Sequence, residues 1–249
     1  MKSVFITGCS SGFGRDTAKF FLENGWKVVA AMRTPDEGIL PRSENLKIVA
    51  LDVKNPESIR RAIDAAGPID VLVNNAGIGW LNAAEGTSIE TMRDLFETNT
   101  FGTIAMTRAV LPQFRERGDG VVVNVSSSVT LKPLPLLSIY TASKAAVNAF
   151  TESVALELAP FNVRVRIVLP GRAPDTRFGD TARSRVQRQG GFPDAYASVV
   201  AGVFAAWEQQ QYAECTRSAD VVEAIWRAAT DPSSPMRIPA GADAVALSA

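Results

Sequence analysis

Short apolar runs alternate with longer helical patterns along roughly the first 170 residues of the chain. The apolar runs are rich in β-branched residues and nearly continuous, which is typical of strands buried on both faces of a parallel sheet. Six strands are expected, at residues 3–7, 27–31, 47–51, 71–74, 120–125 and 164–169. The helical patterns between them are long enough for crossover connections, so the sequence predicts an α/β fold around a parallel sheet.

Local capping signals mark the ends of the predicted helices. A helix that begins near residue 12 is expected to stop at Gly25, which suits a left-handed cap. Asn55 stands before Pro56 as an N-cap stands before the first helical residue. Thr87 has a glutamate three positions later, which is the spacing of a capping box with Thr87 as the cap.

The regular alternation breaks beyond residue 170. Residues 172–215 mix arginine, glycine, proline and aromatic residues with only weak helical periodicity. Neither an internal repeat nor a linker divides the chain, so we expect residues 1–249 to form a single domain. We interpret segment 172–215 as a cover over a substrate site, with a plain surface excursion as the alternative.

Composition and charge narrow the choice of partners. The 26 basic and 26 acidic residues balance, so no electrostatic attraction to nucleic acid or to an anionic membrane is expected. The first strand begins without space for a signal peptide, and no apolar run has the length of a bilayer span. Cys9 and Cys215 are too few for a disulfide framework. These features favour a cytoplasmic protein that acts on a small molecule, with no nucleic-acid or membrane partner.

Histidine is absent from the sequence. Its absence excludes Ser-His-Asp and Cys-His catalysis, histidine-ligated zinc sites and a histidine general base. No metal site is predicted. Proton transfer must then depend on tyrosine, lysine, serine, cysteine or carboxylate groups.

A glycine-rich turn joins the first predicted strand to the first predicted helix. It has the spacing G-x-x-x-G-x-G and consists of Gly8-Cys9-Ser10-Ser11-Gly12-Phe13-Gly14. Glycines let the backbone turn sharply and approach a pyrophosphate, whose charge would lie at the free amides and positive dipole end of the helix. A purely structural turn is the alternative, but the position at the first β–α junction favours dinucleotide binding.

The end of the second predicted strand bears on the choice between NAD and NADP. An acidic residue there would bind the ribose 2′-hydroxyl, whereas an arginine suits a 2′-phosphate. This chain has no acid at that place and has Arg33 beside it. We therefore expect NADP(H) to be preferred, with NAD(H) as the alternative if Arg33 is simply a solvated strand end.

Tyr140 and Lys144 lie four residues apart in a helix expected over residues 140–158, hence on one helix face. An ammonium about 4 Å away would favour the phenolate and lower the pKa of tyrosine by up to about 3 units. Such a tyrosine can exchange a proton with a substrate oxygen. The same spacing is also common on ordinary helices, so alone it decides nothing.

The motifs together resemble the short-chain dehydrogenase/reductase family. The matching elements, in order, are Thr7-Gly8-x-x-x-Gly12-x-Gly14, Asn74-Asn75-Ala76-Gly77, Asn99, Ser127, Tyr140-x-x-x-Lys144 and Pro170-Gly171. Tyr140 follows Ser127 by 13 positions and Asn99 by 41, as in typical members. The glycine turn and the 31–33 segment are similar to the hydroxysteroid- and retinol-dehydrogenase-like branch. The resemblance implies a Rossmann-type, doubly wound parallel sheet in a three-layer α-β-α sandwich.

The resemblance also implies catalytic roles. Tyr140 would be the acid or base at the substrate oxygen. Lys144 would lower the pKa of Tyr140 and bind the nicotinamide ribose. Ser127 would orient the substrate oxygen, although Ser126 and Ser128 flank it and only the family spacing selects the middle serine. Asn99 would hold a water that relays protons to Lys144.

Further residues would bind the cofactor if the resemblance holds. Those expected along the adenosine half are Asp52, Val53, Asn74, Ala76 and Gly77. At the nicotinamide end, Pro170 and Gly171 match the family, but the expected threonine comes one position late, as Thr176. Either Thr176 binds the carboxamide through a bulged loop or Asp175 changes how it is held.

The sequence thus predicts an NADP(H)-dependent oxidoreductase that interconverts a carbonyl and an alcohol, with an apolar substrate suggested by the branch. The alternatives are a non-catalytic NADP-binding redox sensor and an isomerising or dehydrating enzyme that retains its nicotinamide.

Residues 131–139 and the aromatic residues of 178–212 would form an apolar pocket wall or merely pack the core. Arg172 would meet an anionic substrate group or face solvent. The resemblance implies a homodimer or homotetramer through helices at 88–117 and 140–159.

Overall fold

A seven-stranded parallel sheet forms the centre of the molecule in the computed structural model, which describes residues 1–210 and 214–248. The strand order is β3-β2-β1-β4-β5-β6-β7. The strands are β1 (Ser3–Thr7), β2 (Lys27–Met32), β3 (Leu46–Ala50), β4 (Val71–Asn74), β5 (Gly120–Val125), β6 (Val163–Pro170) and β7 (Arg237–Ala240). The order reverses between β1 and β4, so the sheet is doubly wound, as the family resemblance implies.

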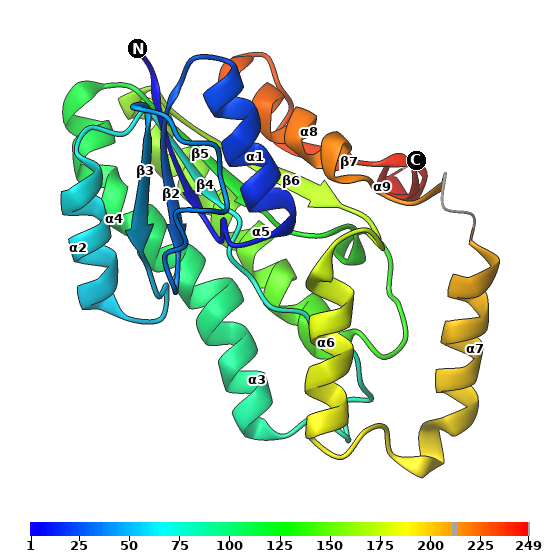
Figure 1. Ribbon diagram of the computed structural model, residues 1–249. Helices are drawn as coiled ribbons and strands as arrows, with labels where there is room; N and C mark the ends of the chain where they lie inside the picture. The colour runs from blue at the N-terminus through cyan, green and yellow to red at the C-terminus, as the bar shows by residue number, and fades with distance from the viewer. Residues whose placement is uncertain (211–213, 249) are drawn as a thin grey trace.

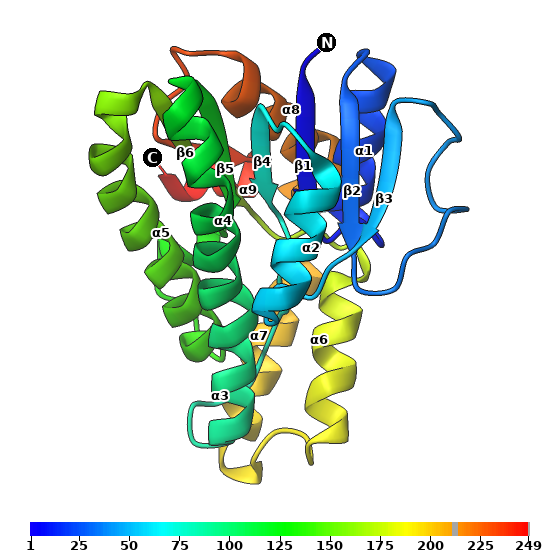
Figure 2. The same ribbon diagram turned by 90° about the vertical axis from the view of Figure 1, so that its left-hand side faces the viewer.

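Helices cover both faces of the sheet (Figure 1). The main helices are α1 (Gly12–Glu23), α2 (Pro56–Ala66), α3 (Ile89–Phe96), α4 (Gly102–Arg117), α5 (Ser138–Leu158), α6 (Arg177–Arg188), α7 (Ala197–Gln209), α8 (Ser218–Thr230) and α9 (Ala242–Ser248). α1 and α8 pack on one face, while α2, α4 and α5 pack on the other and stand in front of the sheet in Figure 2. The three-layer sandwich is therefore confirmed. Among the described residues, no helix combines the length and apolarity of a bilayer span.

Alternate residues of each strand feed two separate cores. In β1, Val4 and Ile6 pack against α1 and α8, whereas Phe5 packs against the opposite layer. This follows from the two-residue period of a strand, whose successive side chains point to opposite faces. Because both faces are covered, the central strands are largely apolar, and each buried apolar side chain contributes about 1.5–3 kcal/mol to stability.

Two of the three predicted helix caps are correct. Helix α1 stops before Gly25, which has φ +76° and donates its backbone N–H to the Leu22 carbonyl oxygen. The Asn55 side chain accepts hydrogen bonds from the first-turn amides of α2, with Pro56 at the first helical position.

The third predicted cap is wrong by one residue. Ser88 caps α3 by accepting a hydrogen bond from the Thr91 backbone N–H, at 3.2 Å. The Thr87 hydroxyl is buried and already engaged, because it donates to the Ala83 carbonyl oxygen and accepts from Trp80 Nε1. The capping-box pattern does not reveal which of two adjacent hydroxyls is taken by tertiary contacts.

Strand β7 is absent from the sequence prediction. It is short and contains Pro239, which cannot donate to a ladder and therefore argues against a central strand. The structure pairs β7 only with β6, at the edge of the sheet, where a proline is tolerated. Strand β7 matters because it places helix α9 beside the end of β6.

Segment 172–215 contains two helices where only weak periodicity is present, although residues 211–213 lie outside the described part. Helices α6 and α7 extend past the carboxyl ends of the strands, together with α3 (Figures 1 and 2). Phe192 and Phe204 pack against a small cluster around Leu81 and Leu136, so part of the aromatic content serves packing.

Candidate functional site

A cleft of about 1210 Å³ opens at the carboxyl ends of β1, β4, β5 and β6. It is centred on the point where the strand order reverses, between β1 and β4. In open α/β sheets the loops diverge at this point and leave a crevice for a ligand. The residues that directly follow these strands, such as Gly8, Asn75, Ser126 and Gly171, line the cleft.

The turn after β1 requires its glycines. Gly8 has φ +76°, and a Cβ on it would lie 2.9 Å from the Ala76 Cα. Gly14 lies against the Gly8 carbonyl group, where a Cβ would overlap. Gly12 has φ +54° and opens α1, so the first-turn amides of that helix face the cleft beside Ser10 and Phe13. Backbone without side chains at a helix start fits a pyrophosphate.

The turn after β4 is fastened to the glycine turn by Asn75 and Thr7. The Thr7 hydroxyl oxygen accepts hydrogen bonds from the backbone N–H groups of Asn75 and Ala76, at 3.0 and 2.9 Å. Asn75 Nδ2 donates back to the Thr7 carbonyl oxygen at 2.9 Å. Sequence reasoning passed over Asn75 as a site residue, although it lies inside the matched Asn-Asn-Ala-Gly motif.

Asn74 lies apart from the other members of that motif. Its side chain is buried between β4, β5 and α4, where Nδ2 donates to Thr107 Oγ1 and Asn124 Oδ1 at 3.0 and 2.9 Å. Ala76 and Gly77 line the cleft, but Asn74 does not. Asn74 is the buried last residue of β4, and the cleft lining begins one residue later, at Asn75.

Several residues expected beside the adenosine half of the cofactor lie together at one end of the cleft. Arg33, Asp52 and Val53 all line it. Arg33 is exposed just after β2, and no carboxylate occupies the strand end, where Met32 is buried. Asp52 Oδ1 accepts a hydrogen bond from the Lys54 backbone N–H, which holds the loop in place.

Asn99 lies in η1 (Glu97–Phe101), a short π-helical turn between α3 and α4. Its Oδ1 accepts from the Ile78 backbone N–H at 2.8 Å, and its Nδ2 donates to the Ile78 carbonyl oxygen and to Ser143 Oγ. Single π-turns often mark functional positions. Here the fully buried amide joins the turn after β4 to α5, which carries Tyr140 and Lys144. The water-relay role of Asn99 stays a prediction.

Ser127 is the serine that meets Tyr140. Both residues line the cleft wall, Tyr140 is buried there, and the Ser127 side chain is the polar group that lowers the pKa of Tyr140. Ser126 Oγ instead donates to the Lys144 carbonyl oxygen at 3.3 Å. The structure thus distinguishes the middle serine by contact, where the sequence does so only by family spacing.

The pKa of Tyr140 moves in the direction opposite to the expected one. Burial raises it to about 12, and the hydrogen bond with Ser127 only partly opposes this rise. Burial also lowers the pKa of Lys144 to about 8. Lys144 Nζ donates to the Val125 carbonyl oxygen at 2.9 Å. Desolvation disfavours both charged forms, so Lys144 stays protonated at neutral pH by a smaller margin than a free lysine, and its charge does not offset the effect of burial on the pKa of Tyr140.

The loop after β6 crosses toward the glycine turn. Thr176 is buried, lines the cleft and lies close to Gly12, whereas Asp175 is exposed and outside the lining. Thr176 Oγ1 donates to the Ala173 carbonyl oxygen at 2.9 Å, which closes the extra-residue bulge. This geometry favours Thr176 over Asp175 at the cofactor.

Comparison with known proteins decides the family. The family model described as short chain dehydrogenase matches residues 2–186 of the chain. The chain belongs to the short-chain dehydrogenase/reductase family. It is therefore an oxidoreductase that acts on a CH–OH or carbonyl group with a nicotinamide cofactor, and the predicted enzyme class is confirmed.

Two curated relatives of this family member are a 3-ketodihydrosphingosine reductase and a retinol dehydrogenase. The first, from Bacteroides thetaiotaomicron, is 36% identical over 198 residues, which cover 78% of this chain and 71% of the reductase. Retinol dehydrogenase 8 of Bos taurus is 37% identical over 182 residues, 68% of this chain but only 58% of the relative. The predicted resemblance to the retinol-dehydrogenase-like branch is confirmed.

Solved structures of short-chain dehydrogenases superpose over nearly the whole chain. One from Streptomyces avermitilis has a TM-score of 0.83 and 33% identity, with 100% of this chain and 92% of that chain covered. A serine dehydrogenase complexed with NADP+ has a TM-score of 0.80 and 29% identity, covering 95% and 93%. A 3-ketoacyl-(acyl-carrier-protein) reductase from Brucella melitensis complexed with NADH has a TM-score of 0.76 and 28% identity, covering 96% of each chain.

The protein also has a C-terminal part of the cleft that sequence reasoning missed. The Asp243 carboxylate, from α9, accepts hydrogen bonds from the Arg172 backbone N–H and Thr216 Oγ1, both at 2.6 Å. Thr216 Oγ1 in turn accepts from the Gly171 backbone N–H at 2.9 Å. Only tertiary structure reveals this junction, because its members are scattered over 70 positions of weakly patterned sequence.

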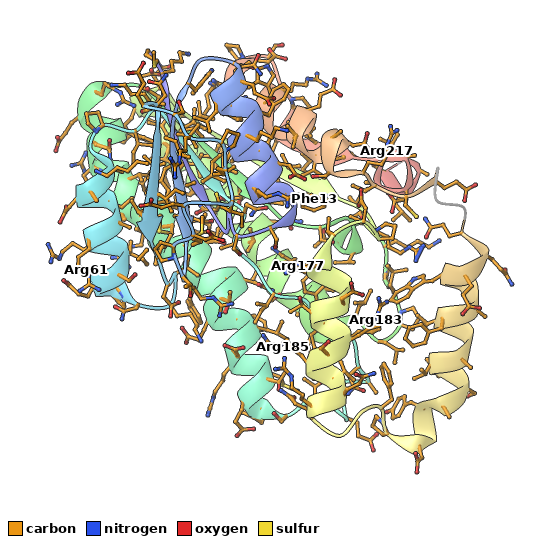
Figure 3. All side chains as sticks on the ribbon, in the orientation of Figure 1. Phe13, Arg61, Arg177, Arg183, Arg185 and Arg217 are labelled. Atoms are coloured by element: carbon orange, nitrogen blue, oxygen red, sulfur yellow. The ribbon has the colours of Figure 1, made fainter. Side chains whose placement is uncertain are left out.

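Helix α6 is attached to α3 across the far end of the cleft. Asp94 of α3 pairs with Arg185 of α6 and with Lys54, which follows β3. Figure 3 shows Arg185 extending from α6 toward α3. Partial burial opposes ionisation of Asp94, but the hydrogen bonds from Arg185 and Lys54 outweigh it and lower its pKa.

Proposed function

We propose that the protein is an NADP(H)-dependent carbonyl reductase, or the reverse alcohol dehydrogenase, for a substrate with an apolar body. The observation that carries the proposal is the buried Tyr140 side chain beside Ser127, at the wall of a cleft that begins on the glycine turn. A protein that only binds NADP(H) as a redox sensor would need the glycine turn, but it would not need Tyr140 and Ser127 side by side.

The residues suit reduction at neutral pH. Bound NADPH would supply the hydride. Because the pKa of Tyr140 is raised to about 12, its hydroxyl holds a proton at neutral pH and serves as a general acid. Ser127 would hydrogen-bond the same carbonyl oxygen and orient it. Oxidation requires Tyr140 to lose its proton first, which burial disfavours.

Preference for NADP(H) is supported by Arg33 and by the absence of an acid at the end of β2 within the described residues. A guanidinium matches a 2′-phosphate, whereas NAD lacks that group. The apolar substrate body is supported by Trp80, Leu137 and Phe178, which line the cleft. The Phe178 and Tyr140 ring centroids lie 6.0 Å apart, so an apolar wall reaches the acid.

The test pairs a panel of ketones and aldehydes with NADPH and NADH in parallel. We expect turnover with NADPH at the higher kcat/KM, and Tyr140→Phe to lower kcat by about 10²–10⁴-fold, the usual contribution of a general acid. The matched control is Tyr196→Phe, because Tyr196 lies far along the cover and bonds Glu85. Full turnover by Tyr140→Phe, or binding of NADPH without turnover of any carbonyl, would contradict the proposal.

We also propose a homodimer or homotetramer in the cytoplasm. Phe101, at the start of α4, and Leu156, on α5, are large apolar side chains that are 56% and 80% exposed. Exposed apolar side chains on adjacent helices favour a subunit contact. Light scattering measures the assembly, and cell fractionation measures the location.

A further inference from the structure

Arg172 lies in the cleft wall rather than in solvent. It is the second residue after Pro170, in the loop that leaves β6, and its side chain is only partly exposed. Its guanidinium carbon lies 5.9 Å from the ring centroid of Trp207, and its Nη2 donates to Cys215 Sγ at 3.5 Å. An aromatic face and a sulfur atom are weak partners for a guanidinium.

The charge of Arg172 has no counter-ion in the part of the chain that the structure describes. Its Nε is buried and makes no hydrogen bond there. Asp243 is close in the structure, but its carboxylate accepts from the backbone N–H groups of Arg172 and Ala244 and from Thr216, not from the guanidinium. Arginine keeps its charge in proteins, and a partly buried unpaired charge is costly.

The position of Arg172 relates it to the reacting group. β5 and β6 pair with Val168 opposite Val125, and the Ser126 backbone N–H donates to the Val168 carbonyl oxygen. The loop that carries Arg172 therefore leaves the sheet on the strand next to Ser127, and neighbouring strands lie about 4.8 Å apart. Both residues line the same cleft.

Apolar side chains line part of the cleft that Arg172 borders. Leu134, Leu137, Phe178 and Trp207 line the cleft with it. The Nε and Nη atoms of a guanidinium form a fork that matches the two oxygens of a carboxylate. A ligand that satisfies both features has an apolar chain and a single anionic end.

We propose that Arg172 binds the carboxylate of the substrate, so that the substrate class is an oxo acid or hydroxy acid with an apolar chain. The inference deepens the proposed function and rests on it. The carbonyl oxygen would lie at Tyr140 and Ser127, with the carboxylate at the Arg172 side of the cleft.

The test measures binding and turnover with three compounds of equal chain length, in the presence of NADPH. These are a medium-chain oxo acid, its methyl ester and the corresponding alkyl phosphate. Binding is followed by intrinsic tryptophan fluorescence, because Trp207 lines the cleft beside Arg172. We expect the native protein to bind the acid at least tenfold more tightly than the ester.

Arg172→Met should weaken binding of the acid and raise its KM by about 10- to 100-fold, with little change for the ester. Arg172→Lys should restore part of the loss. The matched control is Arg183→Met, because Arg183 lines the same cleft, is exposed and already pairs with Asp180 (Figure 3). The Kd of NADPH, measured with each variant, reports folding and the cofactor site independently.

Each remaining outcome has a definite meaning. Equal affinity for acid and ester, or unchanged acid binding by Arg172→Met, overturns the inference. Tighter binding of the alkyl phosphate overturns the choice of a carboxylate, and a weaker NADPH Kd in Arg172→Met assigns the arginine to the cofactor instead. If neutral ketones are reduced while acids are not favoured, only this inference fails. If no carbonyl compound is reduced, the proposed function fails.

Discussion

At the scale of single residues, burial governs the chemistry of the candidate site. Tyr140 and Lys144 are both buried, and their pKa values move toward the neutral forms, to about 12 and about 8. A tyrosine of this kind is a proton donor at rest. Its reactivity then depends on the contact with Ser127 and on whatever charge the bound ligands bring.

The pH dependence of stability tests the Lys144 environment. The folded pKa of about 8 lies below the unfolded value of about 10.4, so between these values the unfolded chain binds more protons and stability rises with pH. From about pH 7.5 to about pH 9 this single group contributes roughly 1 kcal/mol. We expect urea unfolding of Lys144→Met to lack that rise relative to the native protein. Parallel pH profiles for the two proteins would show that the lysine is not desolvated.

Residue identities at the site were predictable, but their environments were not. Tyr140, Lys144 and Ser127 were found from spacing, because the family motif fixes chain positions. The sign of the Tyr140 shift depends on desolvation by side chains from other elements, such as Phe178 of α6. The sequence does not decide between solvent and pocket for Arg172 for the same reason, since its partners Trp207 and Cys215 lie over 30 positions away.

At the scale of elements, strand patterns were more informative than helix caps. All six predicted strands are present, because continuous β-branched runs arise where a sheet is covered on both faces. A helix cap depends on a single hydroxyl or amide group. A tertiary contact that engages this group moves the cap to a neighbouring residue. Strand β7 is short and contains Pro239, so its sequence does not show the pattern of a typical strand.

Two adjacent hydroxyls at the start of α3 provide a test at this scale. We expect Ser88→Ala to lower the free energy of unfolding by about 1 kcal/mol, the usual contribution of an N-cap. Thr87→Ala should cost about 1–3 kcal/mol, because it leaves Trp80 Nε1 buried without its acceptor. Denaturant titrations of both variants measure the difference. If Ser88→Ala is neutral, the cap assignment is wrong.

At the scale of the whole molecule, the cleft is assembled from both ends of the chain. The glycine turn comes from β1 and α1, while Asp243 in α9 fastens the loop after β6. The parallel sheet makes this arrangement necessary, because its carboxyl ends meet at one edge wherever the strands come from in the sequence. Sequence motifs revealed the first half, whereas the second half follows only from the pairing of β7 with β6.

Removal of the Asp243 carboxylate tests the junction. Asp243→Ala leaves the backbone N–H groups of Arg172 and Ala244 without their acceptor and removes one of the two acceptors of Thr216 Oγ1, so we expect a loss of about 2–3 kcal/mol in the free energy of unfolding and weaker NADPH binding. Asp64→Ala is the matched control, because this exposed carboxylate forms only a surface pair with Arg60 and should change stability by less than about 0.5 kcal/mol. Similar unfolding curves for the two variants would count against the junction.

The C-terminal junction has a consequence for the order in which the cleft can be assembled. The phosphate turn and its fastening by Asn75 need only residues of β1, α1 and β4 and of the turns that follow the two strands. The loop after β6 is fastened by Thr216 and Asp243, which follow it in the chain by more than 40 positions. Folding of the first four strands therefore shapes only part of the cleft, and its last wall forms when α9 packs beside the end of β6.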